Sequence, residues 1–196
     1  MSASSNRYIL VTVGSGDATA GDMVVTTLTV GGAGCTNKWA LNGPAWVRSE
    51  GWEKVGPGTG AQTVAVTYTG TCDQVCAGAI SYTDVDPTTP SHNVTTGSGS
   101  GANPSITVTS ASGEVVISGV SSDDGPGLTI STGTERWKVL NVGSDTAYGE
   151  STDAGAASVT MTWTASANNW AMGGLSIYAT GAAPGSANRR FPYKLT

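Results

Sequence analysis

The chain has 196 residues, a length that suits one domain with a single hydrophobic core and needs no disulfides for stability. Only 12% of the residues are charged and 28 are Gly, while Leu is sparse and Val, Thr and Ser are abundant, so a helical protein is excluded and an all-β protein is expected. The formal net charge of -5 argues against nucleic acid as a partner, because contacts to phosphate need Lys and Arg.

The first half of the chain consists of short apolar runs rich in β-branched residues, separated by Gly, Pro, Asn or Asp. This pattern predicts strands at residues 7–13, 23–30, 38–41, 46–48, 52–55, 62–69 and 77–83. The segment 95–103 that follows is rich in Gly, Ser and Thr. We interpret it as a long surface loop.

The second half repeats this rhythm and predicts strands at residues 105–109, 114–118, 128–131, 135–142, 158–164 and 170–178. Several strands alternate cleanly: Val159, Met161 and Trp163 are separated by Thr160 and Thr162. Such alternation predicts one face in the core and the other in solvent. Because no helical period is sustained over three turns, the fold class is all-β, a two-sheet antiparallel sandwich of jelly-roll type.

The composition changes near the C-terminus and divides the chain into an N-terminal extension (1–6), a β-sandwich domain (7–180) and an extended C-terminal arm (181–196). The arm carries Arg189, Arg190, Phe191, Tyr193 and Lys194 and no acidic residue. We expect these residues to dock on a neighbouring subunit; the alternative is an arm that folds onto its own domain. No run approaches the roughly 18 apolar residues of a membrane helix, and residues 1–6 lack the features of a signal peptide, so neither a membrane nor a secretory address is expected.

Four stretches of the chain carry a resemblance to a known kind of domain: residues 64–70, 77–90, 105–117 and 156–177. Together they resemble a β-sandwich module, jelly-roll or concanavalin-like, of bacteriophage structural proteins and large secreted bacterial proteins. The resemblance covers residues 6–178 and implies a fold without an established site. Such modules usually open with an extra strand before the equivalent of residues 7–11, and six residues precede it here. We therefore expect an open sheet edge that can accept a strand, with the C-terminal arm as a candidate donor.

Residue types that could support catalysis are present without a convincing pattern. His92 is the only histidine and stands beside Pro90 and Ser91, so we interpret it as a solvated loop side chain rather than a catalytic base. Three pairs of carboxylates could in principle serve a glycosidase, but each pair is expected in a turn where it caps backbone N–H groups. These pairs are Glu50 with Glu53, Asp84 with Asp86, and Asp123 with Asp124. No enzyme activity is expected.

Metal and redox sites find little support either. Cys35, Cys72 and Cys76 do not have the spacing of a redox or zinc motif, which leaves free thiols or one disulfide open. Asp84 and Asp86 with loop carbonyls could hold Ca²⁺, although their spacing is unlike that of an EF-hand. We expect no cofactor and no metal.

Six Trp residues against a single Phe raise the question of sugar stacking. Trp137, Trp163 and Trp170 lie within predicted strands and are expected to pack, whereas Trp46 and Trp52 flank a turn and are the candidate glycan contacts.

The sequence thus predicts a non-enzymatic structural protein of a phage virion, most consistent with a capsid decoration or cement protein. Its expected partners are other virion subunits, either the major capsid protein or further copies of itself as a homo-oligomer such as a trimer. The alternative is a glycan-binding, lectin-like module of a head fibre or tail.

Overall fold

The computed structural model describes residues 6–16, 24–70, 73–143, 146–166 and 169–179. Within these ranges the chain forms fifteen strands and one 3-10 turn, and no α-helix. The elements are β1 (Tyr8–Gly16), β2 (Val25–Val30), β3 (Ala33–Gly34), β4 (Thr36–Asn42), η1 (Pro44–Trp46), β5 (Val47–Val55), β6 (Val64–Tyr68), β7 (Gln74–Tyr82), β8 (Ser91–Ser100), β9 (Ser105–Val108), β10 (Val115–Ser122), β11 (Thr129–Ile130), β12 (Thr134–Val142), β13 (Thr146–Ala154), β14 (Val159–Thr164) and β15 (Asn169–Ile177).

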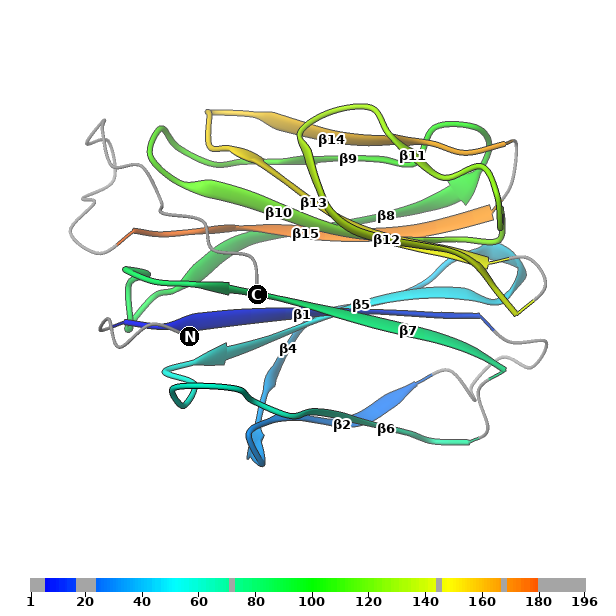
Figure 1. Cartoon of the computed structure of the whole chain (residues 1–196). Coiled ribbons are helices and arrows are strands. Elements are labelled where there is room, and N and C mark those ends of the chain that lie inside the picture. The colour runs from blue at the N-terminus through cyan, green and yellow to red at the C-terminus, as the bar shows by residue number, and fades with distance from the viewer. Residues whose placement is uncertain (1–5, 17–23, 71–72, 144–145, 167–168, 180–196) are drawn as a thin grey trace.

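These strands form four antiparallel sheets stacked in layers (Figure 1). The strand orders, from the bottom of Figure 1 to the top, are β3-β2-β6, β4-β5-β1-β7, β12-β13-β10-β15-β8 and β11-β14-β9. The expected all-β antiparallel sandwich is therefore confirmed, and its stack contains four sheets. The two larger sheets lie in the middle and face each other.

Three hydrophobic cores fill the spaces between the four layers. The central core joins the two larger sheets and includes Leu10 and Leu175, both fully buried. One outer core holds Val11 and Leu28, and the other holds Trp163. Strand β1 sends alternate side chains into two cores, which explains why its sequence is continuously apolar at the start.

The two halves of the chain repeat the same topology. In the first half the larger sheet has the order β4-β5-β1-β7, and in the second half the order β12-β13-β10-β15 places corresponding strands at corresponding positions. The smaller sheets correspond likewise, β2 with β11 and β6 with β14. Strands β4 and β12 even share a register shift at the same place, immediately before Trp39 and Trp137 respectively. The second half has two further strands, β8 and β9.

The repeat is visible in the sequence once the strands are aligned. The run Val-Ala-Val-Thr-Tyr-Thr at residues 64–69 matches Val-Thr-Met-Thr-Trp-Thr at 159–164, and Ala-Gly-Ala-Ile-Ser-Tyr at 77–82 matches Met-Gly-Gly-Leu-Ser-Ile at 172–177. The same spacing of 95 residues separates both pairs of segments. The chain is therefore an internal duplication, with each half a small sandwich.

Reciprocal contacts show how the two halves face each other. The indole of Trp39 lies against Gly173, and the indole of Trp137 lies against Gly78, which is the equivalent of Gly173 in the first half. A Cβ atom on either glycine would overlap the ring. Because the contact occurs twice with the roles of the halves exchanged, the halves are related by an approximate two-fold axis.

Two further observations locate this axis. Thr12 and Gly119 are equivalent residues, and they face each other across the central core, so that a Cβ on Gly119 would lie 3.0 Å from the Cβ of Thr12. The segments that follow β7 and β15 are also equivalent, and they pair with each other in an antiparallel bridge between Val85 and Ala179. Segments that pair with their own equivalents lie on the axis.

Two predictions about the strands are wrong. Residues 95–100, interpreted as loop, belong to β8, and β13 falls where no strand was predicted. The glycines of β8 permit close packing, since a Cβ on Gly97 would lie 3.0 Å from Ile106 and one on Gly99 would lie 3.2 Å from Trp170. The small residues thus belong to a strand against which large side chains pack, and they do not form a flexible linker.

Candidate functional site

Among the described residues, two sheets of the first half end at strands whose equivalents in the second half carry a further strand. In the second half β8 pairs with β15 and β9 pairs with β14. The equivalents of β15 and β14 are β7 and β6, and each of these is the last strand of its sheet. The open edge expected beside residues 7–11 is not found, because β1 pairs with β5 on one side and β7 on the other; β6 and β7 are the edge strands instead.

The open edges leave the outer core of the first half incompletely covered. Val64 and Val66 of β6 are only half-buried, while their equivalents Val159 and Met161 of β14 are buried. On β7, Ala79 is exposed, although its equivalent Gly174 in β15 is buried beneath β9. The same scaffold is therefore closed in one half and open in the other.

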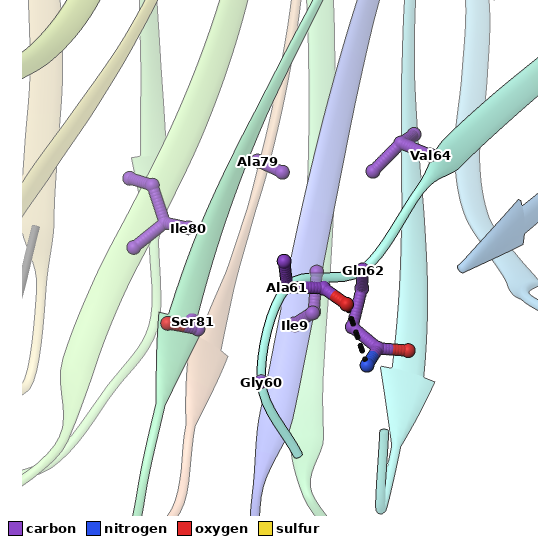
Figure 2. Close-up of a pocket in the computed structure, with 8 residues that line it drawn as sticks. All are labelled: Ile9, Gly60, Ala61, Gln62, Val64, Ala79, Ile80 and Ser81. Carbon is purple, nitrogen blue, oxygen red and sulfur yellow. Dashed lines mark hydrogen bonds between the residues drawn. The ribbon is translucent and has the colours of Figure 1, made fainter. Parts of the chain in front are cut away.

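A hollow of about 440 Å³ lies between the two open edges, and we call it the β6–β7 groove. Figure 2 shows Val64 and Ala79 on its two sides, with Ile9 of β1 between them. The lining residues are Ile9, Gly60, Ala61, Gln62, Val64, Ala79, Ile80 and Ser81. None of them is ionisable. The Gln62 side chain donates to the carbonyls of Thr59 (2.9 Å) and Ala61 (3.1 Å) and so holds its own loop.

Such a groove is suited to an extended polypeptide. The edge of β7 offers backbone N–H and C=O groups to an added strand, and small or apolar side chains line the space beside it. Its described lining holds no ionisable side chain, and Gln62 and Ser81 are the polar residues among those that line it.

The predicted turn position of Glu50 and Glu53 is wrong, because both residues lie in β5 and are buried. Glu50 accepts hydrogen bonds from Arg48 (2.6 Å) and from the indole N–H of Trp52 (3.0 Å). Glu53 accepts bonds from Ser91 (2.6 Å) and Lys38 (3.3 Å) on neighbouring strands. Side chains of the protein itself thus occupy both carboxylates, and neither carboxylate lines the β6–β7 groove.

Glu150 is the most unusual acidic side chain of the described residues. It is fully buried at the interface of the two halves, where Oε2 accepts bonds from Thr12 (2.6 Å) and the indole N–H of Trp137 (2.8 Å). Its Oε1 has no partner within the described part of the chain. Burial raises the pKa of Glu150 to about 7, while the bonds from Thr12 and Trp137 act in the opposite direction. No part of the Glu150 side chain is exposed to solvent.

His92 is not the solvated loop residue that the sequence suggested. It lies in β8, stacks on the ring of Tyr178 with centroids 3.9 Å apart, and places Nε2 3.0 Å from Oε2 of Glu114. The same oxygen accepts bonds from Ser110 (2.9 Å) and Ser176 (2.7 Å). In a nucleophilic triad the imidazole lies between serine and acid. Here the carboxylate occupies that central place, so the cluster ties β8, β10 and β15 together.

The aspartates predicted in turns lie outside the regular strands, and Asp86, Asp123 and Asp124 accept hydrogen bonds from backbone N–H groups. Asp86 accepts bonds from the N–H groups of Thr88 (2.8 Å) and Thr89 (2.9 Å), and these bonds lower its pKa. Asp123 accepts one from the N–H of Asn169 (2.6 Å), which joins two loops.

The candidate glycan residues do not form a described site. Trp52 is half-buried, packs against the outer core and donates to Glu50, so its face is not free for a sugar ring. The side chain of Trp46 lies outside the described part of the structure, as do Cys72 and the arm residues Arg189, Arg190, Phe191, Tyr193 and Lys194. Cys35 and Cys76 are free thiols.

Searches for other kinds of site and for relatives give negative results. The described residues contain no group of three His, Cys, Asp or Glu side chains suited to a metal ion, and no helix of membrane-spanning length and apolarity. Comparisons with protein families, with curated proteins and with solved structures find no match for this chain.

Proposed function

We propose that this protein is a non-enzymatic structural component of a virus particle, a capsid decoration or cement protein that works through contacts with neighbouring subunits. The observation that supports this mode of action is the β6–β7 groove, where two unpaired strand edges flank an apolar hollow. The virus setting is supported by the resemblance of residues 6–178 to modules of phage structural proteins.

The chemistry of the described residues favours binding of polypeptide over catalysis. Four buried carboxylates, Glu50, Glu114, Asp124 and Glu150, each accept hydrogen bonds from protein groups. The groove lining has no ionisable group. A strand added at β7 would gain main-chain hydrogen bonds and cover half-buried apolar side chains, which is the usual basis of strand addition.

The proposal is tested by native mass and by co-sedimentation with particles prepared without the protein. Two variants give the test its specificity: Ala79→Arg places a long charged side chain at an exposed position of the groove, and Thr67→Arg places the same side chain on the exposed face of β6. We expect saturable binding for the parent and for Thr67→Arg, and weakened binding for Ala79→Arg.

Equal binding by both variants would remove the groove from the mechanism. A protein that stays monomeric and does not co-sediment with particles would contradict the structural role. Titration of that monomer with host polysaccharide, followed by Trp fluorescence, would then test the glycan-binding alternative.

A further inference from the structure

The internal duplication specifies which strand the first half lacks. Strand β8 runs along the outer edge of β15, and no described strand occupies the equivalent place beside β7. Strand β8 does not come from within the second half: it follows β7 of the first half through residues 83–90 and crosses to the other sheet. Each half would therefore receive its edge strand from the chain that leaves the other half.

The chain that leaves β15 has the length to complete this exchange. Strand β8 begins at Ser91, after Tyr82 ends β7. The same spacing after Ile177, the end of β15, places the missing strand at residues 186–195. The antiparallel bridge between Val85 and Ala179 shows that the two connecting segments meet on the two-fold axis. From there, residues 83–90 lead to the sheet that contains β15, and an equivalent path for the chain after Ala179 would lead to β7.

We infer that residues 186–195 form a strand antiparallel to β7 of the same chain and fill the place that β8 fills beside β15. The inference deepens the proposed function and rests on it in one respect, that this groove accepts a polypeptide strand; the chain's own segment occupies β7, and the edge of β6 is left for contacts with neighbouring subunits. The register follows from the repeat. Because Ala171 pairs with Ser98, the equivalent Cys76 would pair with Tyr193.

The sequence of the segment suits this position. Phe191, Tyr193 and Leu195 alternate with other residues, which predicts a strand with one apolar face. In the proposed register these three residues lie on the face of β7 that is turned toward the second half. Val139 of β12 is 40% exposed, although Trp137, two positions earlier on the same strand, packs against Gly78 of β7.

One other property of the segment agrees with an edge strand in this place. Pro192 cannot donate a hydrogen bond to a partner strand, and within a strand such a residue suits the edge of a sheet, which is the position assigned here.

A disulfide reports this register directly. In a background where Cys35 and Cys72 are replaced by Ser, the variant Tyr193→Cys places a thiol opposite Cys76, and paired residues of antiparallel strands have Cβ atoms within about 5.5 Å. Lys194→Cys is the matched control, since its side chain would lie on the opposite face. Both proteins are oxidised mildly at low concentration and separated without reductant, and the linked peptides are identified by mass.

We expect most of the Tyr193→Cys protein to form a disulfide within the monomer, and the Lys194→Cys protein to form far less. Disulfide-linked dimers would overturn the assignment to the same chain and show exchange of the segment between copies. Equal disulfide formation in both variants, or none, would overturn the strand itself.

Particle binding, measured on the same proteins, separates this inference from the proposed function. An internal disulfide without particle binding would count against the function alone. Particle binding without the disulfide would count against the strand alone.

Discussion

Replacement of Glu150 by Gln tests the electrostatics at the interface between the two halves. The carboxyl is fully buried, and its Oε2 accepts bonds from Thr12 and Trp137. Burial raises its pKa from the ordinary value of 4.5 to about 7. The folded protein therefore binds the proton more tightly than the unfolded chain, and the resulting stability is complete below pH 4.5 and is lost as the pH rises through about 7.

The size of the effect follows from these two pKa values. At about 1.4 kcal/mol per pH unit, the contribution of Glu150 to the unfolding free energy falls by about 3 kcal/mol between pH 4.5 and pH 7. Glu150→Gln cannot ionise, and its amide oxygen can still accept the bonds from Thr12 and Trp137. We expect the variant to gain stability relative to the parent as the pH rises, by an amount of this order.

Urea unfolding at a series of pH values between 4.5 and 8 measures this difference. Every other titratable group is common to the two proteins, so the contributions of these groups cancel when the two curves are subtracted. A stability difference that does not change with pH would show that Glu150 has the same pKa in the folded and unfolded states. A difference with the opposite slope would show that the folded state favours the ionised carboxylate, and either result would refute the reasoning.

Two further predictions compare equivalent positions of the repeat. Val159→Ala is expected to cost about 2 kcal/mol of unfolding free energy, because it removes two buried methyl groups, and Val64→Ala at the half-buried equivalent position is expected to cost less than half as much. Urea unfolding of both variants measures the two losses, and equal losses would show that the first half is as well covered as the second. Gly173→Ala is expected to lower the unfolding free energy by about 2 kcal/mol or more, because the added Cβ would overlap the buried indole of Trp39. In the control Gly34→Ala the added Cβ meets nothing within 4 Å, and stability is expected to change by less than about 0.5 kcal/mol. Similar melting temperatures for both variants would contradict the close packing of the two halves.

The strands that the sequence predicts best are those with one face in a core. In β14, Val159, Met161 and Trp163 are buried and Thr160 is exposed, so the alternation is visible without any knowledge of the partner strands. Strand β13 has no such pattern, because it is covered on both sides by the rings of other strands. Gly149, for example, lies against Trp163, and a Cβ there would be 2.6 Å from the ring. Small and polar residues at such positions are determined by neighbours that are distant in sequence.

The site was harder to predict than the fold, for two physical reasons. Burial of Glu50 and Glu150 depends on strands that are distant in sequence, because the N–H of Val25 in β2 donates to Glu50 and the hydroxyl of Thr12 in β1 donates to Glu150. The groove is defined by strands that are absent from one half, which becomes visible only when the two halves are compared. A self-comparison of the sequence at a spacing of 95 residues, on which Gly78 matches Gly173, would have found the duplication.

The difference between the halves bears on where the protein binds. Trp39 packs against Gly173 and Trp137 packs against the equivalent Gly78, so the contacts of the central interface are alike on each side of the axis. The sheet edges differ, because β8 and β9 extend the sheets of the second half, while Val64 and Val66 stay half-buried in the first. Local opening is easiest where apolar cover is incomplete, and an added strand gains most at the edge of a sheet. Both arguments place added strands at the first half, the chain's own segment along β7 and further polypeptide along β6.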